Sequence, residues 1–152
     1  MFNFDLQLFG GVKTYNPKDI VVIAGFQQLT GFAEDDIVEV KPRGDGIVPY
    51  DGADGEVGRS IDPNDCLEIT VTLAQTSESN DILSSLYDLD KNTGNGMFPF
   101  AIKDLSGSTL ISATQAWVKT YADAKIGRKI DTRQWTIHTG KADVNIGGGS
   151  ES

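Results

Sequence analysis

The sequence predicts an α+β domain, mostly β, in which an antiparallel barrel or sandwich carries one flanking helix. Residues 66–73 alternate between apolar and polar side chains, which is the period of a strand with one buried face. Ile82, Leu83, Leu86 and Leu89 then follow at helical spacing. The other apolar runs are short and β-branched, and 17 glycines with 5 prolines provide the turns between them.

The N-terminal half of the chain predicts short strands and one long loop excursion. Residues 1–17 are apolar at alternate sites and then glycine-rich, so they are interpreted as an N-terminal arm. Residues 18–24 predict a core strand with which residues 29–32 could pair, and residues 37–40 predict a further strand that is broken by Pro42.

The excursion covers about 42–61, because glycine, aspartate and proline are dense there, with short strands near 46–50 and 56–61. A helix is expected at about 80–91. Either Ser79 or Asn80 would be its N-cap, and Gly94 follows its last turn.

The C-terminal half predicts three more strands, at 97–102, 109–119 and 129–139. Pro99 restricts the first of them to an edge or a bulge. The third strand should place Trp135, Ile137 and Thr139 on one face. The whole of 1–152 is expected to be one domain, comprising the arm, a β core with the helix at 18–140, and a flexible C-terminal tail at 141–152.

The net charge of −9 is distributed unevenly along the chain. Residues 34–65 carry a local net charge of −7, whereas residues 119–141 carry +4. Tight DNA binding is disfavoured by the overall sign, because affinity for DNA comes largely from neutralising phosphates. The two regions are either independent solvated surfaces or complementary patches that meet when copies of the chain assemble.

The chemistry of the sequence does not indicate an enzyme. Cys66 is the only cysteine and is interpreted as a buried bystander, so neither an intramolecular disulfide nor a thiolate metal site is expected. His138 is the only histidine, is expected on an outward strand face, and has no nominated catalytic partner. Asp51, Asp54 and Glu56 could act as acid and base, but they lie in a glycine-rich loop that lacks apolar neighbours.

Two further motifs have simpler explanations. Asp88 to Gly94 begins like a calcium loop, yet the loop's glycine position holds Thr93 and its final glutamate position holds Pro99. A helix end followed by a glycine turn explains the same residues. The tripeptide 43–45 spells Arg-Gly-Asp and is interpreted as a turn. Neither a basic signal-peptide start nor a membrane-length apolar run is found, which suggests a soluble intracellular product.

Three separated blocks resemble the tail tube proteins of contractile-tailed, myovirus-type bacteriophages and of related phage-tail-like particles. They are DGADGEVGRSID at 51–62, LEITVTLAQTSESNDILSSL at 67–86, and AWVKTYADAKIGRKIDTRQWTI at 116–137. The resemblance implies a non-enzymatic virion protein without cofactors. Such a protein forms hexameric rings that stack into the inner tail tube, the conduit for genome delivery during ejection.

The resemblance also implies partners: further copies of the chain, the tail sheath protein, and baseplate and tail terminator proteins. Genomic DNA would pass through the lumen without specific binding, and assembly would take place in the host cytoplasm without a membrane. Contacts between subunits or rings are assigned to eight candidates. They are Asp51, Asp54, Glu56, Arg59, Lys125, Arg128, Lys129 and Arg133.

Glu68, Thr70 and Thr72 are the candidates for the lumen face, because they are the polar positions of the 66–73 strand. Two other functions fit a small acidic β protein. One is a monomeric β-barrel that binds a small ligand, and the other is a ring protein of an effector-delivery tube in a secretion system. A hydrolase would need a nucleophile that the sequence does not nominate.

Overall fold

The computed structural model describes residues 16–34 and 37–147. The predicted N-terminal arm therefore lies almost entirely outside the described residues. The described part contains nine strands, one α-helix and one short 3-10 helix. In chain order these are η1 (Pro17–Asp19), β1 (Ile20–Ala24), β2 (Gln27–Gln28), β3 (Val38–Pro42), β4 (Ile47–Asp51), β5 (Val57–Ile61), β6 (Cys66–Ala74), α1 (Ser79–Thr93), β7 (Phe98–Asp104), β8 (Leu110–Thr120) and β9 (Thr132–Asn145).

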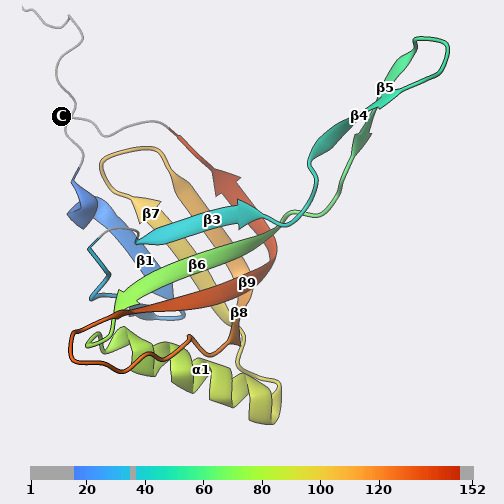
Figure 1. The fold of residues 1–152 in the computed structure, drawn as a ribbon. Coiled ribbons are helices and arrows are strands. Elements are labelled where there is room, and N and C mark those ends of the chain that lie inside the picture. Colours follow the sequence, from blue (N-terminus) through green and yellow to red (C-terminus); the bar gives the residue numbers. More distant parts are fainter. Residues whose placement is uncertain (1–15, 35–36, 148–152) are drawn as a thin grey trace, which may run out of the picture.

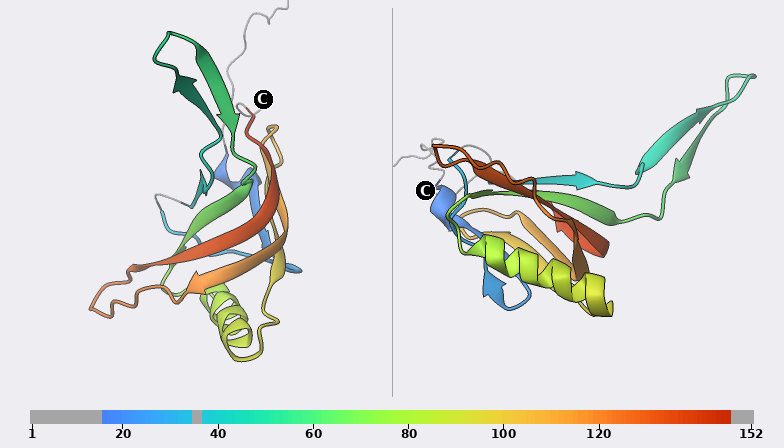
Figure 2. Two further views of the ribbon diagram at one scale, coloured as in Figure 1. Left: turned by 90° about the vertical axis from the view of Figure 1, so that its right-hand side faces the viewer. Right: turned by 60° about the horizontal axis from the view of Figure 1, so that its bottom comes forward.

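Seven of the strands form one curved antiparallel sheet with the order β2-β1-β7-β8-β9-β6-β3. Its edges are β2 and β3, so the sheet wraps around a core without closing into a barrel (Figure 1). The helix α1 lies along one end of the curved sheet. The remaining strands, β4 and β5, pair only with each other and project as a hairpin far from the core (Figure 2). The predicted mostly β, antiparallel architecture with one helix is confirmed.

The core is built from the alternating inward positions of the sheet. In β6, Ile69, Val71 and Leu73 are completely buried, as the alternation of this segment predicts. In β9, the predicted face of Trp135, Ile137 and Thr139 is buried as well. Leu83 of α1 completes the core from the helix side. Full burial of each such aliphatic side chain contributes about 1.5–3 kcal/mol, so these positions dominate the stability of the sheet.

The helix starts differently from the prediction. Its N-cap is Glu78, which makes no side-chain cap bond. Ser79, one of the two predicted caps, uses its side chain elsewhere. Ser79 Oγ accepts a hydrogen bond from the backbone N–H of Thr30 at 2.8 Å, and Ser79 is 1% exposed. Ser77 Oγ instead accepts from the N–H of Ser79 at 3.1 Å. The C-terminal prediction is confirmed, since Gly94 ends α1 in the left-handed conformation.

The amide of Asn80 joins three parts of the fold. Its Nδ2 donates to the backbone carbonyls of Ala74 and Ser77, each at 3.0 Å, which fixes the turn between β6 and α1. Its Oδ1 accepts from Trp135 Nε1 at 2.9 Å. One polar side chain thereby ties the β6–α1 junction to β9, and it satisfies the only polar atom of the Trp135 ring.

Several predicted boundaries are wrong for identifiable reasons. The last strand runs to Asn145, and Ala142 is buried against β8, so residues 141–145 belong to the sheet and not to a flexible tail. The pairing with β1 is made by Gln27–Gln28, whereas Phe32 crosses to bridge Leu73 of β6.

The proline positions follow the edge-or-bulge rule. Pro99 lies in the interior of the sheet, and the pairing of β7 with β8 shifts register there between Phe98 and Phe100. Pro42 is the last residue of β3 and lies on an edge strand, so it ends that strand and does not break it.

Replacing Asn80 tests its role at the junction. Asn80→Ala would leave the buried Trp135 N–H without an acceptor and would free the β6–α1 turn, so we expect the free energy of unfolding to fall by about 2–3 kcal/mol. Urea unfolding followed by tryptophan fluorescence measures the loss. Asn92→Ala, at an exposed position of the same helix, is the matched control and should leave stability within about 0.5 kcal/mol. Equal stabilities of the two variants would contradict this role.

Candidate assembly surfaces

The hairpin of β4 and β5 is exposed along the whole length of both strands. Its strands pair in register from Ile47 opposite Ile61 to Asp51 opposite Val57, and all ten strand residues are exposed. Ile47, Tyr50, Val57 and Ile61 are each more than half exposed, although they are large and apolar. An isolated two-stranded ribbon is at best marginally stable in water, so this geometry favours a hairpin that gains a partner surface.

A hinge of backbone and carboxylate contacts sets the direction of the hairpin. Asp62 Oδ2 accepts from the N–H of Asp45 at 2.8 Å, and Asp62 Oδ1 accepts from the N–H of Asn64 at 3.0 Å. These two bonds, the Asp45 bond first, hold the pKa of Asp62 below its ordinary value of 3.8. A Cβ at Gly44 would collide with the carbonyl oxygen of Asn64, so the two stalks of the hairpin approach closely here.

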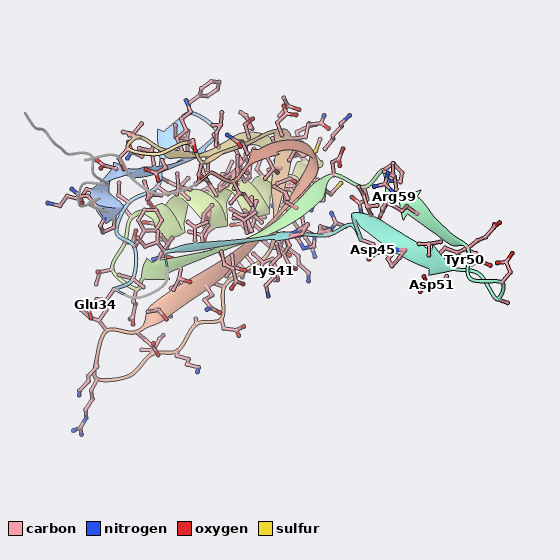
Figure 3. All side chains as sticks on the ribbon, turned by 90° about the horizontal axis from the view of Figure 1, so that it is seen from above. Glu34, Lys41, Asp45, Tyr50, Asp51 and Arg59 are labelled. Atoms are coloured by element: carbon pink, nitrogen blue, oxygen red, sulfur yellow. The ribbon has the colours of Figure 1, made fainter. Side chains whose placement is uncertain are left out.

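Four of the predicted contact residues, Asp51, Asp54, Glu56 and Arg59, are distributed along the hairpin. Figure 3 shows Asp45 near the base and Tyr50 and Asp51 toward the far end. Asp54 Oδ1 accepts from the N–H of Glu56 at 3.2 Å and thereby shapes the tip turn. Arg59 lies opposite Pro49, on the same face of the ribbon as Asp51. Among the described residues, no ion pair joins these charges to each other or to the basic candidates.

The basic candidates lie at the opposite end of the molecule. Residues 121–131 connect β8 to the start of β9 and protrude beside α1, far from the hairpin in every view (Figures 1 and 2). Arg133 donates from Nη1 to the carbonyl of Lys125 at 3.3 Å. The base of the loop is held by Gln75, whose N–H donates to the carbonyl of Asp131 and whose Oε1 accepts from the N–H of Asp131.

Two isoleucines in this basic loop were not predicted as site residues. Ile126 is 85% exposed and Ile130 is 69% exposed, in the midst of Lys125, Arg128 and Lys129. A weak signal was present in the sequence, because isoleucine in a glycine-containing, lysine-rich turn lacks the alternation that would bury it. Asp62 was also missed, since only the structure shows its contacts across the hairpin base.

The predicted lumen face is only partly open. Glu68 is half-buried beside His138, with Oε1 and Nε2 3.3 Å apart, and Thr70 is on the same face. Thr72 is only 7% exposed. Its backbone N–H donates to the carbonyl of Ile37, and its carbonyl accepts from the N–H of Ala33, so these two residues pair with β6 at this position. Thr72 is therefore largely covered in the isolated subunit, and its assignment to the lumen face stays a prediction.

The remaining predictions concern chemistry. His138 lies on the outward face of β9, next to Trp117, as expected. Asp88 and Asp90 belong to α1, which explains the calcium-like spacing by a helix end. Cys66 is half-buried at the start of β6, so its interpretation as a buried residue is wrong.

In residues 16–34 and 37–147, no group of three potential metal ligands comes together. Within the same ranges, no helix is both long and apolar enough to cross a membrane.

Comparison with known proteins identifies the family. The family model of the bacteriophage PhiTE tail tube protein matches residues 21–147. This chain belongs to that tail tube family. Structural protein ORF10 of Pseudomonas phage KPP10 is 34% identical over 147 residues, which are 91% of this chain and 85% of that protein. This chain, as a member of the tail tube family, is thus a structural phage protein and a virion component, not an enzyme.

Two solved structures share the fold of this family member. One is the cap of the anti-feeding prophage, described as its tube terminating cap, with a TM-score of 0.56 and 11% identity over 93% of this chain and 99% of that one. The other is the sheath/tube terminator of PVC, an extracellular contractile injection system, in its extended state. Its TM-score is 0.55, with 10% identity over 88% of this chain and 97% of that chain.

Asp62 provides a test of the hinge. Asp62→Ala removes both acceptors at the hairpin base, so the amide protons of Asp45 and Asn64 should exchange faster and the hairpin amides should show lower NMR order parameters. Asp51→Ala, an exposed aspartate in the hairpin itself, is the control and should leave the base unchanged. Unchanged exchange at Asp45 in the Asp62 variant would show that the carboxylate does not hold the hinge.

The same carboxylate predicts a pH dependence of the hinge. The pKa of Asp62 is lower in the folded chain than in the unfolded one. Its contribution to the stability of the hinge is therefore present above pH 3.8 and is lost as the pH falls through the folded-state pKa. An NMR titration of the Asp62 carboxyl carbon should give a pKa below 3.8, with the Asp45 amide shift following the same curve. A carboxyl pKa at or above the ordinary value would contradict the hydrogen bonding.

Proposed function

We propose that this tail tube family member forms hexameric rings that stack into the inner tube of a phage tail, through which the genome passes at ejection. The observation that carries the proposal is the placement of two different exposed surfaces at opposite ends of one subunit. The hairpin brings apolar strands and the carboxylates Asp51, Asp54 and Glu56 to one end, and the 121–131 loop brings cations to the other. Two unlike surfaces on opposite ends generate a head-to-tail stack.

The open edges of the sheet support ring closure. The edge strand β3 pairs with β6 on one side, through bonds that involve Ile37 and Arg43 at its two ends. In an antiparallel pair alternate residues point to opposite sides, so Val38 and Val40 direct their backbone groups to the free side. An edge of this kind accepts another chain, and β2 at the far side of the sheet is only two residues long. Addition of neighbouring subunits at these edges would continue the sheet around a ring.

The electrostatics are compatible with a DNA conduit. A net charge of −9 opposes adhesion to phosphates, and we propose that Glu68, Thr70 and Thr72, which share one face of β6, contribute to the lumen wall. The sheath, baseplate and terminator proteins would then bind other faces of the tube. A monomeric ligand-binding barrel is less favoured, because the described sheet ends in two edges and encloses no lumen of its own.

A tube terminator is the second candidate function. It is supported by the two solved structures that share this fold, of which one is a tube terminating cap and the other a sheath/tube terminator. The family model and the KPP10 relative favour the tube subunit. A ring protein of an effector-delivery tube would have the same assembly and different cargo.

Electron microscopy of the purified protein over a concentration series tests the proposal directly. Hollow tubes of uniform width built from six-fold rings are the expected result, with the measured mass rising from subunit to polymer. Single rings that never stack would favour the terminator. A monomer at every concentration, even after addition of short tube seeds, would overturn ring formation by this chain alone.

Charge reversal at Asp54 and Glu56 tests the contact candidates at the tip of the hairpin. Asp54→Lys combined with Glu56→Lys should raise the critical concentration for tube assembly by several-fold to about tenfold, since each exposed ion pair contributes about 0.2–1 kcal/mol. The effect should shrink as salt is added, because the pairs are exposed and screened. Light scattering across a salt series measures both quantities.

The matched control for this experiment is a charge swap. Adding Lys125→Asp and Lys129→Asp to the doubly reversed hairpin restores opposite signs at the two ends, so assembly should recover if these groups meet across rings. Reversal that leaves both the critical concentration and its salt dependence unchanged would mean that these residues do not form the contact.

A further inference from the structure

A groove of about 520 Å³ lies at the base of the hairpin and is named here the basal groove. It is bounded by β3, by both stalks of the hairpin, by the start of β6 and by the end of β9. Its apolar lining includes Val40, Leu67, Ala142, Val144 and Ile146. Of these, Val144 and Ile146 are 44% and 72% exposed, so part of the apolar lining faces solvent in the isolated subunit.

The polar lining of the basal groove is acidic. Four carboxylates border it, Asp45, Asp62, Asp65 and Asp143, and among the described residues that line it there is no lysine, arginine or histidine. An occupant of this groove should therefore combine apolar side chains with positive charge.

The tip of the 121–131 loop has this combination. Residues 125–130 read Lys-Ile-Gly-Arg-Lys-Ile, with three cations and no carboxylate. Ile126 and Ile130 are among the most exposed large apolar side chains of the described chain. A Cβ added at Gly127 would meet nothing within 4 Å, so the tip stands clear of its own subunit and is free to enter a recess.

The loop and the groove cannot meet within one subunit, because they lie at opposite ends of β9. The loop leads into Thr132, where β9 begins, and the groove is lined by residues 142–144 near its end. Ten residues of strand at about 3.3 Å each separate the two by roughly 33 Å. The views in Figures 1 and 2 agree with this separation. The occupant, if it is this loop, must come from a second copy.

We propose that the 125–130 tip of one subunit seats in the basal groove of the next subunit along the tube, with Ile126 and Ile130 on its apolar lining and the three cations facing its carboxylates. This inference rests on the proposed stacking of rings and names the seat that the contact uses. In this position the cations face the carboxylates at the hairpin base, Asp45 and Asp62, and not Asp54 and Glu56 at its tip. The axial repeat is then set by the distance along β9 from loop to groove, roughly 30–45 Å.

A disulfide test follows from the position of the single cysteine. Cys66 lines the basal groove and is only half-buried, so the sulfur reports on the occupant. Two chains are mixed: the unaltered protein, and a tagged chain that carries Cys66→Ser with Ile126→Cys. After assembly and mild oxidation, each chain has one thiol, one in the groove and one in the loop. We expect a disulfide-linked dimer of one tagged and one untagged chain on a non-reducing gel.

Geometry makes this signal specific. A disulfide requires Cα atoms within about 7 Å, so the cross-link forms only if the loop of one copy reaches the groove of another. Phe26→Cys with Cys66→Ser is the matched control, because Phe26 is completely exposed but lies at neither surface. Its mixture with the unaltered protein should give at least tenfold less of the mixed dimer.

The outcomes separate this inference from the proposed function. Tubes that form normally but give no more mixed dimer than the Phe26 control would overturn the seat while ring stacking stands. A mixed dimer in a preparation that never forms rings would keep the seat and overturn the tube. Absence of both tubes and the mixed dimer at high concentration would overturn both.

A second pair of variants guards against loss of folding. Ile126→Asp should raise the critical concentration for tubes at least tenfold, whereas Leu105→Asp, at a 68% exposed turn position that belongs neither to the loop nor to the groove lining, should change it less than twofold. Both variants should show the same urea unfolding midpoint as the parent, since neither side chain packs in the core. Equal assembly by the two variants would contradict the seat.

Discussion

The long pairing of β9 with β6 on one side and β8 on the other is the constraint on which the rest of the structure depends. These two interfaces hold the central part of the sheet in register from Ala74 opposite Thr132 to Leu110 opposite Asn145. They decide which side chains face inward, where α1 meets Trp135 through Asn80, and how far the curved sheet extends. A one-residue slip of β9 would exchange its buried and exposed faces, so this register is strongly specified.

Strand β9 also fixes the distance between the basic loop and the basal groove. The basic loop precedes β9, and the basal groove lies beside its far end. A rigid strand between two contact surfaces transmits a defined spacing, which a flexible linker would not. The hairpin is held to this frame by Asp62 and by the close approach of Gly44 to Asn64, and not by a core of its own. Its apolar strands thus stay available for a partner at a defined place.

Local patterns in the sequence predict much of this fold and little of its surfaces. The alternation in 66–73, the spacing of Leu83 and its neighbours, and the glycine at 94 predict β6 and α1 because each signal acts within a few residues. The hairpin strands were also found, since turn residues separate them. Other features depend on contacts between residues far apart in sequence. They are the burial of Thr72, the hydrogen bond from the Thr30 N–H to Ser79 Oγ, and the open edges of the sheet. For the same reason charge segregation was visible in the sequence and the exposure of Ile126 and Ile130 only weakly so, whereas the acidic groove was not.

Stacking through two unlike surfaces has a consequence for how such a tube begins and ends. A head-to-tail contact leaves one unused surface at each end of every intermediate, so growth has no intrinsic stopping length. Each exposed pair is weak, but in the proposed ring of six subunits six loops and six grooves would engage together, and the energies of these contacts would add within one rigid body. A lone subunit gains only one contact and pays the full loss of its rotational and translational freedom. Addition of complete rings is therefore favoured over addition of single subunits, and closure at the β2 and β3 edges should precede or accompany stacking.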